Sequence, residues 1–240
     1  MTGVKSWDEV RASVSEASAL RSSSERYALA LIGLPGTGKS TLAGELRRQR
    51  PDLDIRQTTG FHASGSRMTE LIHRLYVEGE REVSLALQLE ALARRAILTT
   101  GAHALTIIDE PMESVRAHSR AMFEVGLLTN LELASWLLAS DVIAAALPQA
   151  QTVALVACNE DERVRRLGER GRTRDRSVRD SYTAALESAL NSEISEVRPD
   201  RQVLRIDTTA AGPRDLLKQV AMGLPHSNAG LVERDARVRP

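Results

Sequence analysis

The sequence predicts an α/β fold in which helices cover both faces of a parallel sheet. Five short apolar runs alternate along the chain with longer stretches of helical periodicity. Strands that alternate with helices favour a parallel sheet with right-handed crossovers. The first apolar run is continuous, as in a strand buried on both faces. The 240 residues are enough for one sizeable domain with its own hydrophobic core.

The first half of the chain begins the alternation. A strand at 27–32 runs into a glycine-rich turn and then into a helix at 39–48. A short second strand is expected at 53–58, followed by helices at 67–76 and 80–99. The leucines of the longer helix recur with amphipathic spacing, which predicts one face turned to the core.

The second half repeats the pattern. Its expected elements are, in chain order, a strand at 104–108, helices at 112–125 and 129–146, a strand at 152–157, an arginine-dense helical stretch up to residue 172, a helix at 178–197, a strand at 202–206 and a helix at 214–222.

Three segments divide the chain: a helical preamble at 1–24, the α/β domain at 25–224 and a tail at 225–240. Within the preamble, residues 6–21 carry apolar side chains at helical spacing. The tail has few large apolar residues and a charged end, which predicts a flexible terminal arm.

The bulk composition argues against nucleic acid and anionic membranes as partners. Lysine plus arginine and aspartate plus glutamate both total 32, so no global field attracts nucleic acid or an anionic membrane. The single cysteine, Cys158, cannot form an intramolecular disulfide and fits a reducing compartment. With no signal peptide or membrane-spanning stretch recognised, the sequence predicts a cytoplasmic protein.

The turn after the first strand, "GLPGTGKS", matches G-x-x-x-x-G-K-[ST] between a buried strand and a helix. Backbone amides of such a loop curl around phosphate oxygens, and the helix N-terminus adds positive potential. We therefore predict a P-loop NTPase fold that uses ATP and Mg²⁺. The predicted donor-binding residues are Gly33, Leu34, Pro35, Gly36, Thr37, Gly38, Lys39, Ser40 and Thr41.

The phosphate-binding loop alone does not distinguish a kinase from an ATPase or a GTPase. The chain contains no N-K-x-D element for guanine and no serine-glycine-glycine signature of transporter ATPases. A small kinase-like domain or a compact ATPase remains.

The third predicted strand ends in two adjacent acids, in "TIIDEP". Asp109 is predicted to hold Mg²⁺ together with Ser40, and Lys39 to reach the outer phosphates. The role of Glu110 depends on the enzyme class, because in motor and transporter ATPases a second acid polarises water.

The stretch "YVEGEREVSLALQLEALARRAI", residues 76–97, resembles a helix of the deoxynucleoside kinase family, with its L-Q-L-x-x-L-x-x-R run. The resemblance implies that Gln88 reads the nucleobase. It continues in "AMFEVGLLTNLELASWL", residues 121–137, and covers about 28–222.

The segment "CNEDERVRRLGERGR", residues 158–172, is similar to the lid of that family. The resemblance places Arg166, Arg170 and Arg172 in the lid register. Guanidinium groups there can close over the transferring phosphoryl group and neutralise its charge. The resemblance also implies the thymidylate-kinase-like strand order 2-3-1-4-5, an arginine-rich lid and a homodimer.

The chain departs from the family pattern at two places. Family members carry a glutamate after the second strand as general base, whereas "IRQTTGFHASGS" contains no acid; Gln57 cannot accept a proton, and His62 is the nearby titratable base. At the third strand, Glu110 stands where the family has an arginine.

One hypothesis joins both departures: Glu110 is the general base or orients the acceptor hydroxyl in a remodelled site. A competing hypothesis makes Asp109 and Glu110 a hydrolytic pair. A third is a nucleotide-binding module that acts through partners. Glu113 is a candidate substrate contact, although an acid near a helix N-terminus also stabilises the helix dipole.

The sequence thus predicts a phosphotransferase that moves the γ-phosphoryl group of Mg-ATP to a hydroxyl of a nucleoside-like small molecule. A kinase for another hydroxylated metabolite is the alternative within the same class. The predicted catalytic residues are Lys39, Asp109, Glu110, Arg166 and Arg170, with Arg172 on the donor.

Overall fold

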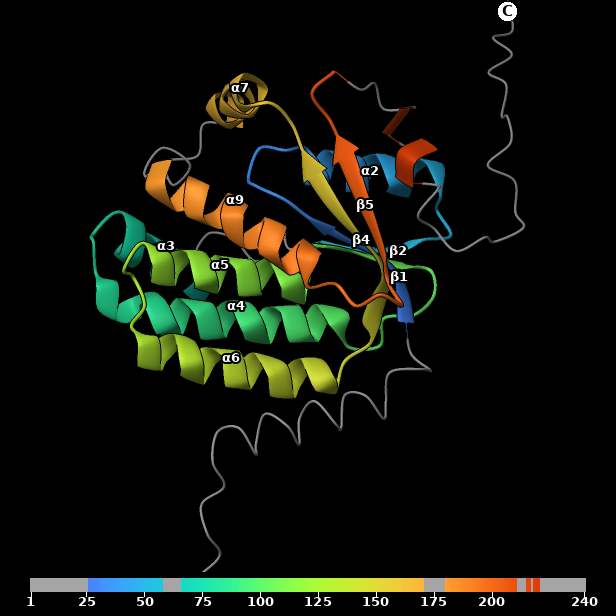
Figure 1. The fold of residues 1–240 in the computed structure, drawn as a ribbon. Helices are drawn as coiled ribbons and strands as arrows, with labels where there is room; N and C mark the ends of the chain where they lie inside the picture. The colour runs from blue at the N-terminus through green and yellow to red at the C-terminus, as the bar shows by residue number, and fades with distance from the viewer. Residues whose placement is uncertain (1–25, 58–65, 171–179, 211–214, 217, 221–240) are drawn as a thin grey trace, which may run out of the picture.

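A computed structural model describes residues 26–57, 66–170, 180–210, 215–216 and 218–220. It confirms the predicted fold, a five-stranded parallel sheet in the order β2-β3-β1-β4-β5 (Figure 1). The strands are β1 Arg26–Ile32, β2 Asp54–Arg56, β3 Thr106–Asp109, β4 Gln149–Ala157 and β5 Gln202–Asp207. The helices are α2 Lys39–Gln49, α3 Arg67–Tyr76, the 3-10 turn η2 Arg81–Val83, α4 Ser84–Thr99, α5 Met112–Glu124, α6 Asn130–Ala145, α7 Glu160–Arg170 and α9 Asp180–Ser195.

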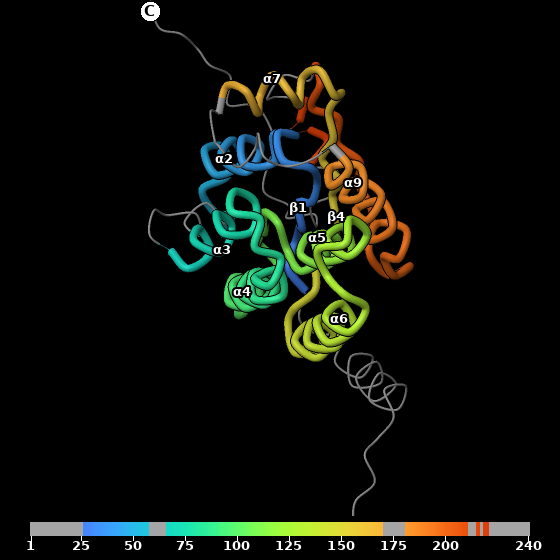
Figure 2. Tube along the Cα trace, turned by 90° about the vertical axis from the view of Figure 1, so that its left-hand side faces the viewer, coloured from blue at the N-terminus to red at the C-terminus, as the bar shows by residue number. Residues whose placement is uncertain are grey.

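The central strand, β1, divides the core in two. Leu29 and Leu31 face α2, where they pack with Leu42 and Leu46. Alternate residues of β1 face the opposite layer, which α3, α4, α5 and α9 form together (Figures 1 and 2). Because both faces of the strand are covered, its sequence is apolar at every position after Arg26, as parallel sheets require.

A further helix lies outside this three-layer arrangement. α6 packs on α4 and α5 rather than on the sheet (Figure 2). Trp136 is fully buried there, and its indole Nε1 donates to the backbone oxygen of Gln88 at 3.1 Å. α6 therefore holds the middle of α4 in place.

The differences from the predicted bounds are small and have local causes. The second strand is shorter than expected, and the Arg56 side chain leaves it to donate to the carbonyls of Leu98 and Thr100 at 2.7 Å. The third strand begins two residues later and ends one residue later than expected, so that it includes Asp109. The preamble and tail predictions fall outside the described residues. Within those residues, no helix has both the length and the apolar character needed to cross a bilayer.

A charged cluster joins α5, α6 and α9. Arg116 donates to Asp141 at 2.7 Å, and Arg120 donates to Glu196 at 2.9 Å. Glu193, with 5% of its side chain exposed, lies 3.5 Å and 3.3 Å from the two guanidinium groups. Since their hydrogen bonds go to the other two acids, burial dominates and raises the pKa of Glu193 to about 7.

Glu193→Gln should flatten the pH dependence of stability between pH 4.5 and 7. In this window the native state keeps a proton that the unfolded chain releases, so the free energy of unfolding falls as pH rises, by up to about 3 kcal/mol for this pKa shift. Urea unfolding at pH 5 and pH 8 measures the effect. Glu196→Gln is the matched control, because the hydrogen bond from Arg120 outweighs burial at Glu196 and lowers its pKa, the opposite of the shift at Glu193. An unchanged slope in Glu193→Gln would contradict the assignment.

Candidate active site

The phosphate cradle follows β1 directly and occupies the carboxyl edge of the sheet. Gly33 has a φ of 151°, and a Cβ there would lie 2.2 Å from the carbonyl oxygen of Val156 in β4. Gly38 has a φ of 90° and begins α2. Only glycine fits at position 33, because the loop backbone there packs directly against the backbone of β4.

Lys39 is held inside the cradle that it serves. Its Nζ donates to the carbonyl oxygens of Gly33 at 2.6 Å and Leu34 at 2.9 Å, and 5% of the residue is exposed. The same Nζ lies 3.9 Å from Oε1 of Glu110. The ammonium group thus sits between the phosphate loop and the end of β3.

Ser40 and Asp109, the two residues predicted to bind Mg²⁺, lie next to each other. Ser40 Oγ donates to Asp109 Oδ2 at 2.9 Å, while Asp109 Oδ1 is buried and has no hydrogen-bond partner among the described residues. Burial and the neighbouring Glu110 raise the pKa of Asp109, and Lys39 opposes them. A buried, unsatisfied carboxylate oxygen beside a hydroxyl fits the hard oxygen ligands that Mg²⁺ prefers.

Gln57 is the first residue after β2, in the segment where the sequence contains no acid. Its Nε2 lies 3.5 Å from Asp109 Oδ2 and 3.4 Å from the Ser40 carbonyl oxygen. Arg47 donates to its Oε1 at 3.1 Å, so the amide group faces the metal pair. Gln57 therefore supports Asp109 and supplies no base; His62 lies outside the described residues.

Glu110 has a left-handed backbone, with a φ of 61°, that is rare for a residue with a side chain. Its N–H donates to Leu31 O at 3.0 Å, which ties it to β1. Its Oε2 accepts a hydrogen bond from Arg95 Nη2 at 2.8 Å. The turn aims the carboxylate away from the sheet, toward α4 and Lys39.

Arg95 is a site residue that the sequence analysis did not single out. It is 7% exposed, and burial lowers its pKa while Glu110 and Asp109 oppose that effect. Two signals could have found it. It fills the final arginine of the L-Q-L-x-x-L-x-x-R run, and it lies seven residues after Gln88, on the same face of the helix.

The lid helix α7 packs directly on the cradle. Arg166 donates through Nη1 to Thr208 Oγ1 at 2.9 Å and through Nη2 to Thr208 O at 2.8 Å. A Cβ on Gly38 would lie 3.1 Å from Arg166 Nη1, and one on Gly36 would lie 3.0 Å from Leu167. Of the other predicted lid residues, Arg170 ends α7 and Arg172 lies outside the described residues.

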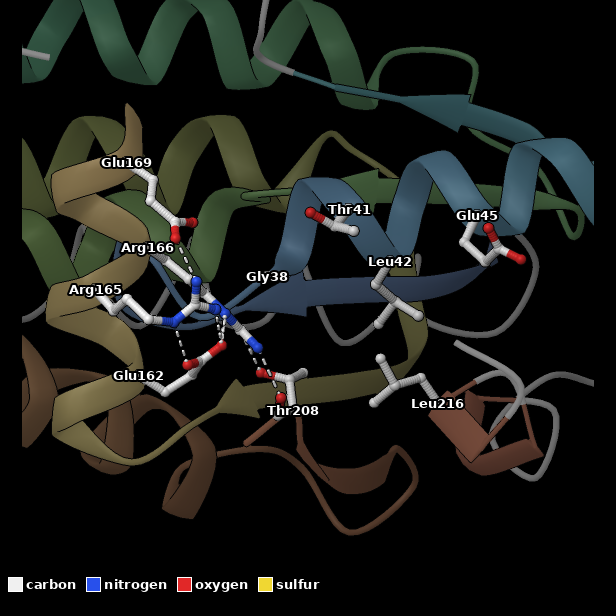
Figure 3. Close-up of a pocket in the computed structure, with 10 residues that line it drawn as sticks. All are labelled: Gly38, Thr41, Leu42, Glu45, Glu162, Arg165, Arg166, Glu169, Thr208 and Leu216. Carbon is white, nitrogen blue, oxygen red and sulfur yellow. Dashed lines mark hydrogen bonds and ion pairs between the residues drawn. The ribbon is translucent and has the colours of Figure 1, made fainter. Parts of the chain in front are cut away.

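A pocket of about 460 Å³ opens between α2, α7 and the turn after β5 (Figure 3). Its lining residues are Gly38, Thr41, Leu42, Glu45, Glu162, Arg165, Arg166, Glu169, Thr208 and Leu216. Leu42 and Leu216 face each other on one side, and the lid arginines lie on the other (Figure 3). Its size suits a small ligand. It adjoins the turn after β5, whereas Glu110 follows β3, and these two strands lie on opposite sides of β1 in the sheet.

Gln88 lies deep in the helical layer, 4% exposed. Its Nε2 donates to Met122 Sδ at 2.8 Å, and its Oε1 accepts from Ser119 Oγ at 2.8 Å. A base that reached Gln88 would have to displace these contacts. Its role in reading a nucleobase stays a prediction.

Glu113 lies apart from the cradle. Its Oε1 accepts a hydrogen bond from Arg201 Nη2 at 2.6 Å, and Arg201 also donates to the carbonyl oxygen of Ala150. Ala150 pairs with Tyr27 near the start of β1, whereas the cradle follows the end of that strand. The structure therefore gives Glu113 a structural partner, and its contact with substrate stays a prediction.

Glu110→Gly should unfold less readily than Glu110→Ala. Both variants lose the carboxylate, but only alanine keeps a Cβ in the left-handed conformation, at a cost of about 1–2 kcal/mol. The greater freedom of glycine in the unfolded chain offsets about 0.4–1 kcal/mol of that. Urea unfolding at neutral pH should show glycine ahead by about 1 kcal/mol. Equal stability would show that the turn at this position relaxes without its carboxylate.

Comparisons with known proteins point to the fold. No family model matches the chain, and no curated protein matches its sequence. Deoxyadenosine kinase from M. mycoides with bound dATP aligns with a TM-score of 0.63 at 15% identity, over 81% of this chain and 95% of that chain. The same kinase with bound dCTP gives 0.62 at 14% identity, over 81% and 95%, and with the products dCMP and a flexible dCDP it gives 0.61 at 14%, over 81% and 94%. The chain therefore has a fold like that of a deoxynucleoside kinase.

Proposed function

We propose that this protein transfers the γ-phosphoryl group of Mg-ATP to a hydroxyl group of a nucleoside-like small molecule. The observation that carries the proposal is the position of the Glu110 carboxylate. It lies 3.9 Å from the phosphate-binding Lys39, on the side of the cradle away from the donor pocket. A carboxylate there faces the acceptor across the transferring group.

The donor side combines the cradle with the pocket beside it. Amides of the loop and the N-terminus of α2 hold the phosphates, with Lys39 at the outer ones. The pocket between Leu42 and Leu216 has room for the base and sugar, with Thr41 and Thr208 on its rim. Arg166 already lies over Gly38, and Arg170 and Arg172 of the lid would supply further charge.

Ser40 and Asp109 would hold Mg²⁺ between the cradle and β3. Their oxygens lie within one hydrogen bond of each other, and the free Asp109 Oδ1 offers a buried acceptor. When bound, the ion neutralises charge on the phosphate oxygens. Gln57, with its amide toward Asp109, keeps this carboxylate in place.

Glu110 acts on the acceptor. It orients the hydroxyl group in line with the γ-phosphorus and takes its proton as the new O–P bond forms and the bond to the β-phosphate oxygen breaks. Lys39 and the lid arginines neutralise the charge of the transferring group. Because such catalysis is mainly positioning and charge neutralisation, a carboxylate at the end of β3 can replace one after β2.

The setting of the enzyme follows from its surface and composition. Zero net charge and a single cysteine support a cytoplasmic enzyme with a small-molecule partner and no nucleic acid or membrane partner. Exposed Leu89 and Ile97 on α4, with Leu131 and Val142 on α6, support a homodimer.

ADP release should depend on the acceptor. Purified protein is incubated with Mg-ATP and a panel of nucleosides and other small alcohols, and ADP and phosphorylated product are quantified together. A kinase releases ADP only with its acceptor. Acceptor-free release would replace the proposal by hydrolysis at the Asp109–Glu110 pair, and ATP binding without any turnover would replace it by a regulatory module.

Glu110→Gln should lower acceptor-dependent turnover by about 10²–10⁴-fold, since the amide cannot accept a proton. Binding of a fluorescent ATP analogue should stay within about threefold of the parent, because the carboxylate lies on the acceptor side. Lys39→Met is the contrasting variant, which should weaken analogue binding itself. Undiminished turnover of a folded Glu110→Gln protein would exclude Glu110 as the base.

A further inference from the structure

We propose that Arg95 is a positioning residue that acts on phosphoryl transfer only through Glu110. It holds the Glu110 carboxylate at the acceptor side of the cradle and makes no necessary contact with the acceptor. The inference rests on the proposed function, in which this carboxylate orients the acceptor hydroxyl.

The Glu110 carboxylate depends on a partner outside its own strand. Its main chain is fixed to β1 through Leu31, in the left-handed conformation that ends β3. Its side chain is 26% exposed and has several single bonds that can rotate. The 2.8 Å hydrogen bond from Arg95 joins this side chain to α4, whereas the contact with Lys39 is 3.9 Å long. Arg95 therefore lies closer to the Glu110 carboxylate than Lys39 does.

Arg95 is itself buried, on a helix that other contacts hold in place. It belongs to the inward face of α4, with 8% of its side chain exposed, and its carbonyl oxygen accepts a hydrogen bond from Thr99 Oγ1 at 2.8 Å. The indole of Trp136 fixes the same helix two turns earlier, at the carbonyl oxygen of Gln88. A buried guanidinium costs free energy of desolvation, so its presence on a core-facing stripe points to a task other than stability.

The charges around the pair explain why one arginine matters. Among the described residues, the ionisable groups that act on Glu110 or Arg95 include Lys39 from α2, Asp109 from β3, Arg94 from α4 and Tyr182 from α9. Arg94 is bonded to Glu90 at 2.6 Å. Among the described residues, Arg95 is thus the guanidinium that reaches the carboxylate directly.

Two other readings of the same contact make different predictions. A purely structural ion pair would affect folding and leave the chemistry of the folded protein unchanged. An arginine that contacts the acceptor would affect transfer whether or not Glu110 is present. A double-mutant cycle separates all three, because a residue that acts through another has no effect once the other is gone.

The cycle uses the full chain, and acceptor-dependent ADP release is measured for Arg95→Met, Glu110→Gln and the double variant. Arg95→Met should lower kcat about 100-fold, as expected when a catalytic group loses its geometry, with KM for ATP within about threefold. In the Glu110→Gln background the same change should alter kcat less than about twofold. Arg95→Lys should recover about tenfold of the loss, since it keeps the charge without the planar fork.

Arg94→Met is the matched control. It removes a guanidinium from the adjacent position, where the partner is Glu90 rather than Glu110, and its kcat should stay within about twofold of the parent.

An equal loss from Arg95→Met in both backgrounds would overturn the inference in favour of direct acceptor contact. Full kcat per folded molecule in Arg95→Met would overturn the inference and show that Arg95 and Glu110 form a purely structural ion pair. Recovery of both thermal stability and kcat in the exchanged variant Arg95→Glu with Glu110→Arg would show the same.

A crystal structure of Arg95→Met gives a readout that does not depend on turnover. A displaced Glu110 carboxylate upholds the positioning role, and an unmoved one overturns it. Absence of acceptor-dependent turnover in the parent protein would defeat the proposed function alone, because the position of the carboxylate still decides the role of Arg95.

Discussion

The parallel pairing of β1 with β3 is the constraint on which the site depends. In this register Leu31 lies opposite Asp109, so the acid ends its strand beside the loop that leaves β1. The Ser40 hydroxyl, one residue into α2 from Lys39, can then reach the carboxylate at 2.9 Å. On the other side of β1, the carbonyl oxygen of Val156 in β4 leaves no room for a side chain at Gly33. Parallel strands bring their carboxyl ends to one edge of the sheet, and the cradle lies at that edge between the ends of β3 and β4.

Charge is balanced locally as well as in the chain as a whole. Among the described residues, Lys39 and Arg95 face Asp109 and Glu110 across the end of β3, so that two cations oppose two anions. The uncharged amide of Gln57 adds no third anion beside Asp109. Under the proposed function, Glu110 is the carboxylate on the acceptor side, and it lies within reach of an arginine on α4.

The fold could be predicted closely because its signals are local. Continuous apolar runs located the strands, and the expected order of the strands followed from a family resemblance carried by the cradle, α4 and the lid. The cradle could also be predicted from the sequence, since glycine spacing encodes its backbone shape. The partners of individual side chains could not be predicted. Glu113 binds Arg201, and Gln88 binds Met122 and Ser119, because separate elements of the chain pack together there.

By itself the sequence determined the α/β alternation, the phosphate loop, the acid that meets Ser40 and the absence of an acid after β2. These depend on residue type and spacing along one segment. Only the tertiary structure decided where Glu110 points. Its left-handed residue is tied to β1 through Leu31 and its carboxylate is hydrogen-bonded to Arg95 on α4, and no local pattern encodes the distance between two side chains on separate elements.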